Sequence, residues 1–273
     1  GREKFKYLSY ATTDANGFYK PNPVGTTTYT GSPHQLYYAN GTADKVADDA
    51  KPYSETVFIP SALNQVLEQG SPGTAWQPDA AHSYTSSDRT VKFAQEPNVA
   101  SEVLRWTYTY PTAAYPLGIV NTGTGSTPAF YGVNQLYRSK TKDENRNEII
   151  EFKDNEDKVV LKKVQAPAGQ WAQTYYIYDG FGNLVCVMPP EAVARLASEY
   201  YHSGANDATK DAFLKRWAFR YTYDSRKRMT QKQIPGAEPV YLVYDKRDRL
   251  VLTQDGKQRS LATKHWTFTK YDD

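Results

Sequence analysis

Four histidines and one cysteine are the side chains of this 273-residue chain best suited to metal binding or nucleophilic chemistry: His34, His82, His202, His265 and Cys186. A zinc or redox site needs such residues at short, regular spacings. None of the five has that spacing to another, so the pattern predicts no metal, no cofactor, and histidines on the surface or in turns. Cys186 lies in an apolar run without a second cysteine, which favours a small packed side chain.

Carboxylates offer another route to catalysis, because a glycoside hydrolase needs only two of them facing each other. The acids with the clearest pattern are Asp179, Asp224 and Asp245, and each follows a tyrosine and precedes turn residues. The run "DNED" at 154–157 lacks the glycine and the distal glutamate of a calcium loop. These acids therefore predict turns.

Phosphate-binding and acyl-transfer motifs give no better candidate. The glycine-rich run "TGTGS" at 122–126 has no helix pattern after it that would present backbone amides to a phosphate. No Gly-x-Ser-x-Gly sequence marks a serine nucleophile. We therefore expect that the chain is not an enzyme.

Composition predicts a folded, sheet-rich chain. Hydrophobic residues make up 39% and charged residues 23%, and there are 23 tyrosines, which suit half-buried strands. The net charge is +3, and the densest charged stretch, Lys142–Lys163, alternates in sign, so it does not resemble a nucleic-acid footprint. No apolar run approaches the roughly 18 residues of a membrane span.

A repeat explains the tyrosine–aspartate pairs. Each pair is followed by two residues, a turn residue, a polar residue and a new apolar run. The pairs are Tyr178-Asp179, Tyr223-Asp224 and Tyr244-Asp245; the turn residues are Gly182, Lys227 and Asp248; the polar residues are Asn183, Arg228 and Arg249. This pattern predicts β-hairpins in which the aspartate caps a turn and the turn residue takes a positive φ. Lys227 fits that conformation poorly, so its turn is expected to differ.

Weaker copies fit the same frame. Asp154 and Asp157 take the aspartate and turn places of one copy, Asn64 takes the turn place of another, and Tyr271-Asp272 begins a further copy. Pro235-Gly236 and Asp255-Gly256 are expected to reverse the chain between hairpins. The sequence therefore predicts a β-rich region with long loops over residues 1–150, including a degenerate repeat near 53–78, and hairpins over 151–273 that continue it.

One stretch departs from the strand pattern. Pro190 suits a helix start, and Val193, Leu196, Ala197 and Tyr200 fall on one helical face. Ser203-Gly204 should end this helix, and a second is expected from about Asp207 to Lys215. We expect a small helical insert near 190–216, laid against the sheet.

The segments "YDGFGNLV", "YDSRKRM" and "YDKRDRLV" resemble the YD repeats of the RHS (rearrangement hotspot) family, whose consensus is Tyr-Asp, two residues, Gly-Arg-Leu. The segment Tyr53–Pro78 is similar to the domain of unknown function that precedes the repeats in many large bacterial RHS proteins. The resemblance covers nearly the whole chain.

The resemblance implies antiparallel sheet strips that spiral into a hollow shell around a C-terminal effector. It carries over no catalytic residue, because the self-cleaving aspartyl protease signature of the family's core domain is absent from this sequence. The expected fold is mainly β: hairpin repeats forming a curled sheet or partial shell, with at least one unpaired edge that a loop or a partner covers.

The resemblance also implies a function. We expect a non-catalytic segment of a secreted or cell-surface bacterial RHS protein that helps to enclose or present a C-terminal effector. Its partners would be neighbouring repeats, and either an enclosed effector or surface glycans. The alternative is a glycan- or protein-binding adhesin module, since "HQLYYAN" at 34–40 and "RWTYTYPTAAYP" at 105–116 are rich in aromatics that stack on sugars or pair across strands.

Overall fold

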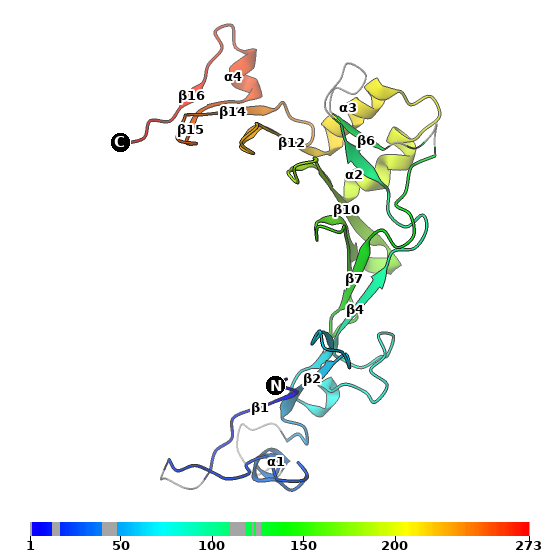
Figure 1. The fold of residues 1–273 in the computed structure, drawn as a ribbon, viewed down its shortest axis with the longest axis vertical. Helices are drawn as coiled ribbons and strands as arrows, with labels where there is room; N and C mark the ends of the chain where they lie inside the picture. The colour runs from blue at the N-terminus through cyan, green and yellow to red at the C-terminus, as the bar shows by residue number, and fades with distance from the viewer. Residues whose placement is uncertain are drawn as a thin grey trace. The chain divides into compact units, whose positions relative to one another are not determined.

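The computed structural model describes residues 2–12, 17–39, 48–109, 118–121, 123 and 127–272. The described residues are mainly β, and their paired strands are antiparallel, so the predicted fold class is confirmed. Two compact units are present (Figure 1). Unit 1 comprises residues 1–95 and 139–149, and unit 2 comprises residues 96–138 and 150–273.

Unit 1 is built on one run of antiparallel strands. Its elements are β1 (Phe5–Tyr7), α1 (Pro33–Ala39), β2 (Tyr53–Phe58), β3 (Val66–Gly70), η1 (Thr74–Trp76) and most of β4 (Val91–Pro97) and β7 (Tyr137–Lys142). Hydrogen-bonded neighbours follow the order β1-β2-β3-β4-β7. β1 has β2 as its one hydrogen-bonded strand neighbour among the described residues, so an end of the sheet lies here and the sheet is open.

Unit 2 contains the hairpin repeats. Its strands are β5 (Trp106–Tyr108), β6 (Ile119–Asn121), most of β8 (Glu148–Lys153), β9 (Val159–Gln165), β10 (Trp171–Tyr178), β11 (Leu184–Met188), β12 (Phe219–Tyr223), β13 (Met229–Gln233), β14 (Val240–Tyr244), β15 (Leu250–Gln254) and β16 (Thr267–Phe268). Strands β8 to β16 pair in sequence order, and β5 pairs with β6. Because the strands pair in sequence order, the turns that follow the Tyr-Asp pairs all lie at the same end of the strands.

The connections between hairpins differ from one another. Gly236 has φ 70 in a tight reversal, as the sequence predicts. Asp255 instead caps the short helix α4 (Gly256–Ser260), where its Oδ1 accepts the Gln258 N–H at 2.7 Å. η2 (Pro167–Gly169) connects β9 to β10.

The helical insert is present and lies against β10 and β11 (Figure 1). It consists of α2 (Pro190–Arg195), the π-helical turn η3 (Leu196–Tyr200) and α3 (Asp207–Trp217). The predicted inward face is wrong at Ala197, which is exposed, whereas Ala192 is fully buried. The extra residue of the π turn, closed by Tyr201 N–H to Leu196 O at 2.8 Å, rotates the face so that Leu196 and Tyr200 point inward.

The apolar core belongs to unit 2. Its fully buried side chains include Phe152, Leu161, Cys186, Met188 and Leu214. Cys186 packs as the predicted small hydrophobe, and burial raises the pKa of its thiol to about 12. Oxidation or metal binding at neutral pH would need the thiolate, which this environment suppresses.

Residues 96–138 pack with the repeats of unit 2 and not with the N-terminal region to which the sequence assigned them. The Leu104 N–H donates to the Tyr175 hydroxyl at 3.2 Å, and the Trp106 ring lies 5.2 Å from that of Tyr200. Aromatic side chains far apart in sequence thus join this segment to β10 and the insert.

Unit 1 has a different interior. Every fully buried hydrophobic side chain among the described residues lies in unit 2. Unit 1 buries polar side chains instead, among them His34, Glu68, Thr90 and Lys92. Its stability therefore depends on how well these groups satisfy one another.

Candidate functional site

The Asp179 turn shows how one aspartate organises a hairpin. Its Oδ1 accepts the backbone N–H groups of Phe181 at 2.9 Å and Asn183 at 2.8 Å. The Gly182 N–H donates to Asp179 O at 3.0 Å, and Gly182 has φ 81. One carboxylate thus binds the two amides that the reversal leaves without backbone partners.

The same geometry recurs with different side chains. Asp154, Asp224 and Asp245 each accept the N–H groups two and four residues ahead, at 2.8–3.0 Å. In two turns the following arginine also donates to the second oxygen: Arg228 Nε to Asp224 at 2.7 Å and Arg249 Nε to Asp245 at 2.8 Å. The backbone conformation is therefore the same in all four turns, whereas the charges of their side chains differ.

A further turn of this kind was not found in the sequence. Asp143 accepts the N–H groups of Asn145 and Asn147, and Arg146 has φ 69 at the turn place. Lys142 replaces the tyrosine, as Lys153 does before Asp154, and Glu148 replaces the apolar residue that restarts the strand in the other copies, which hid the match. The available signal was the spacing of Asp143 and Asn147, which equals that of Asp179 and Asn183.

Two expectations about turn shape need correction. The Lys227 turn does not differ from the others: φ is 61 and its N–H donates to Asp224 O at 3.0 Å. Asn64 has the expected positive φ of 53, but its turn is longer, because Gln65 O accepts the Ile59 N–H six residues earlier.

The tyrosine of each pair contacts the preceding hairpin and not its own turn. The hydroxyls of Tyr178, Tyr223 and Tyr271 donate to the carbonyls of Val159, Leu184 and Leu250 at 3.1, 2.9 and 2.9 Å. Each acceptor is the first residue of the preceding second strand. The strand register shifts by one residue at Tyr178, Tyr223 and Tyr244, a bulge that adds local twist.

A basic residue completes the link between hairpins. Lys158 lies 5.7 Å from the Tyr178 ring centroid, Arg228 lies 5.1 Å from Tyr244, and Arg249 lies 5.0 Å from Tyr271. Arg2 and Phe58 of unit 1 repeat this relation at 5.6 Å. An arginine that binds its own aspartate therefore also holds the next tyrosine by a cation–π contact.

The turn residue of a hairpin, the position of Gly182, Lys227 and Asp248, lies beside the turn of the previous hairpin. A contact between the two turns explains why a lysine is found at position 227 despite its positive φ. Its Nζ donates to Phe181 O at 3.0 Å. In the next turn Asp248 occupies this place and binds Arg226 and Arg228 at 2.8 and 2.6 Å. A contact between neighbouring turns thus favours a long or charged side chain at a position where the backbone conformation alone favours glycine.

Replacing Lys227 by glycine should raise the free energy of unfolding of unit 2 by about 0.5–1 kcal/mol, because glycine takes positive φ without steric cost. Loss of the Phe181 contact offsets part of the gain. Lys227→Ala, which loses the contact and keeps the steric cost, should be slightly less stable than the wild type. Urea midpoints measure both, and a Lys227→Gly midpoint at or below that of the wild type would contradict this explanation.

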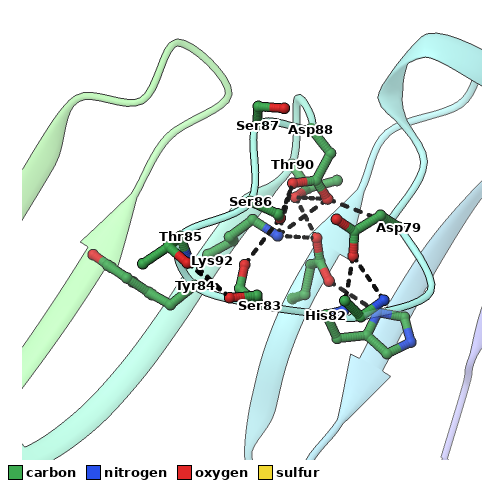
Figure 2. Close-up of polar contacts among 12 residues, drawn as sticks. Asp79, His82, Ser83, Tyr84, Thr85, Ser86, Ser87, Asp88, Thr90 and Lys92 are labelled. Carbon is green, nitrogen blue, oxygen red and sulfur yellow. Dashed lines mark hydrogen bonds and ion pairs between the residues drawn. The ribbon is translucent and has the colours of Figure 1, made fainter.

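A second polar site lies in unit 1 (Figure 2). The Lys92 ammonium contacts Glu68 and, at 3.0 Å, Asp88, and its side chain is only 2% exposed. Thr90 donates to Glu68 at 2.5 Å, and the His82 Nδ1 lies 3.1 Å from the other Glu68 oxygen. We call Glu68, His82, Asp88, Thr90 and Lys92 the ionic cluster.

The ionic cluster fastens the loop between η1 and β4 to the sheet. Asp79 accepts the N–H groups of Ala81 and His82 at 2.9 and 2.8 Å, and its own N–H donates to Asp88 at 3.3 Å. Ser86 donates to Asp88 (Figure 2). The loop is therefore held by one buried ammonium and the carboxylates around it.

The histidines depart from the sequence prediction at one position. His34 is buried, with Nδ1 2.9 Å from the Tyr29 hydroxyl and Nε2 2.7 Å from Leu8 O, so it is not a surface histidine. Tyr7, Tyr10 and Tyr38 surround its ring. No group of three or more potential metal ligands occurs among the described residues.

The aromatic clusters lie in two places. Tyr37 and Tyr38 of the first cluster pack against each other beside His34, and Asn40 lies outside the described residues. In the second, Trp106 is buried and Tyr108 lines a groove, while residues 110–116 lie outside the described residues. The glycine-rich run is described only at Gly123.

Acid should weaken both units. Burial opposes ionisation of Asp88, but hydrogen bonds with Glu68, Ser86 and Lys92 together outweigh it and hold its pKa below the usual range. Arg228 lowers the pKa of Asp224, and the Arg249 backbone and side chain lower that of Asp245. A carboxyl with a lowered folded pKa stabilises fully above its unfolded value of about 4 and loses that contribution as pH falls through the folded value.

We therefore expect the urea midpoint to be constant from neutral pH to about pH 5 and to fall steeply below about pH 4. Asp224→Asn, with one of these carboxyls removed, should show a shallower fall in unit 2. A midpoint that rises on acidification would contradict the assignment of these carboxylates as stabilising.

Comparison with known proteins finds a family match for part of the chain. Residues 1–90 match the family model described as a domain of unknown function, DUF6443, and this range includes the whole of Tyr53–Pro78. No curated protein matches the chain. None of the helices in the described ranges has the length and hydrophobicity of a membrane span.

A solved structure titled "Crystal Structure of TcdB2-TccC3-TEV" resembles 74% of this chain at 13% sequence identity and a TM-score of 0.32. The matched region spans 9% of that chain. A TM-score this low supports no conclusion, and the fold rests on the strand pairing itself.

Proposed function

We propose that the chain is a non-catalytic structural segment of a secreted or cell-surface bacterial RHS-repeat protein. There it forms part of a β-shell that encloses or presents a C-terminal effector. The observation that carries this proposal is the link from each hairpin to the next. Tyrosine hydroxyls bind the preceding hairpin, and basic side chains contact the tyrosine of the next one, so successive hairpins are joined twice.

Two further observations support a scaffold. The match of residues 1–90 to DUF6443 agrees with the kind of domain that precedes RHS repeats. The patterned carboxylates are used by their own turns, since Asp179 and Asp224 accept several protein donors each. Acids that hold backbone amides in place are poorly suited to act on a substrate.

A glycan-binding adhesin module is the second candidate. It is favoured by a groove of about 740 Å³ that Tyr108, Phe181 and Tyr223 line. Sugar hydroxyls need acceptors as well as ring faces, and the groove's two carboxylates already accept donors of their own turns. The groove therefore supports this candidate less strongly than the linked hairpins support a scaffold.

Native mass spectrometry of the intact natural parent chain tests the proposal. A shell around an effector predicts a C-terminal piece that is cleaved yet remains bound under native conditions and separates on denaturation. An uncleaved chain, or a piece that dissociates without denaturant, would move the adhesin candidate forward. Glycan-array binding by the wild type, lost in Phe181→Ser, would then support it.

A further inference from the structure

The four turns of unit 2 form a continuous row, which we call the turn ridge: residues 154–158, 179–183, 224–228 and 245–249. Their hairpins pair in sequence order, so successive turns lie next to each other at one end of the strands. Strand spacing puts neighbouring turns roughly 10 Å apart. Lys227 to Phe181 O and Arg226 to Asp248 are direct contacts between neighbours.

Charge along the turn ridge changes sign at its middle. The first two turns contain four acidic residues and one basic residue, for a net charge of −3. The last two contain three acidic and six basic residues, for a net charge of +3. Most of the charged residues in the middle of these turns are exposed: Glu156, Asp157, Arg226, Lys227, Lys246, Arg247 and Asp248.

The groove of about 740 Å³ lies where the sign changes, between the turns at Asp179 and Asp224. Asn183 stands there at the place that Lys158 and Arg228 fill in neighbouring turns, and its shorter side chain leaves the space open. Phe181 lines the groove and is 78% exposed. An exposed large apolar side chain thus sits beside a cavity able to receive one.

We propose that the turn ridge is a self-association surface, on which a second copy of this chain docks about a twofold axis through the groove. A surface that is acidic at one end and basic at the other is complementary to itself after a twofold rotation, which apposes each acidic half to a basic half. Phe181 of each copy enters the groove of the other.

A partner that is neutral, or that has charges of one sign only, explains less of the charge pattern of the turn ridge. Such a partner would leave one charged half without a counterpart, whereas a second copy matches both halves at once. The ends of the ridge are roughly 30 Å apart, well beyond the screening length of about 10 Å at 0.1 M salt. The two halves therefore act as separate charges in the contact.

Two charge variants of the whole chain test the proposal. Arg226→Glu/Lys246→Glu/Arg247→Glu makes both halves acidic, and Glu156→Lys/Asp157→Lys makes the acidic half net basic. Each should have a dimer dissociation constant at least about tenfold higher than that of the wild type. An equimolar mixture should form a heterodimer, since the acidic ridge of one faces the basic ridge of the other.

Analytical ultracentrifugation and native mass spectrometry at low salt read the outcome, with Lys257→Glu/Lys264→Glu as a matched control away from the ridge. Phe181→Ser should weaken the dimer, and the control should not. Circular dichroism melts confirm that each variant folds. A wild type that stays monomeric at concentrations up to the order of 100 μM, and so has a dissociation constant above that value, would overturn the proposal. So would a mixture without heterodimer.

Discussion

Replacing Lys92 by methionine is expected to lower the free energy of unfolding of unit 1 by about 3–5 kcal/mol, since it leaves buried carboxylates without their cation. Glu68 and Asp88 would then face each other with no ammonium between them. The loss is large relative to the stability of a small domain. Unit 1 has no fully buried hydrophobic side chain among its described residues to compensate.

Amide hydrogen exchange of β3 and β4 measures this effect locally, so the stability of unit 2 does not obscure it. Lys4→Met is the matched control: Lys4 pairs with Glu55 at the surface of the same unit, and its removal should change stability by no more than about 1 kcal/mol. Adding Glu68→Gln to Lys92→Met should restore part of the loss, because it removes one of the two opposed charges. Equal exchange in Lys92→Met and Lys4→Met would contradict the role of the ionic cluster.

Replacing Asp179 by alanine is expected to lower the free energy of unfolding of unit 2 by about 2 kcal/mol, about 1 kcal/mol for each backbone N–H that loses its acceptor. For a unit of this size that corresponds to a fall of roughly 4–8 °C in Tm. The turn joins β10 to β11, which carry much of the apolar core. The loss should therefore spread into the insert.

The neighbouring residue supplies the control. A Cβ at Gly180 would meet no atom within 4 Å, so Gly180→Ala should be neutral or slightly stabilising. Asp179→Asn keeps an oxygen for the Phe181 and Asn183 amides and should lose less than half as much as Asp179→Ala. If Asp179→Ala and Gly180→Ala melt together, the turn does not depend on its carboxylate.

Local chemistry made the hairpins predictable. An aspartate that binds amides two and four residues ahead acts within its own turn, so its spacing is visible in the sequence. The same reasoning failed at Lys227, whose positive φ depends on Phe181 of another hairpin, 46 residues away. It also missed Asp143, because that turn is followed by Glu148 instead of an apolar residue and lacks the tyrosine, which makes contacts between hairpins and is not needed for the turn.

The ionic cluster could not be read from the sequence. Lys92 stands between Val91 and Phe93, and Glu68 follows Leu67, an alternation that predicts charged side chains on the solvated face of a sheet. Only the pairing of β3 with β4, which sets Glu68 opposite Lys92, brings their side chains together. The π turn at Leu196 is hidden for the same reason, since packing against Trp106 decides which face turns inward.

Cryo-electron microscopy of the natural parent chain tests the central claim most directly. We expect strands β8 to β16 to continue into neighbouring repeats as one wall, with each tyrosine hydroxyl on the preceding hairpin and no substrate at the turns. A map in which these strands close on themselves as a separate domain would contradict it. So would a map in which the Tyr-Asp turns line a catalytic pocket.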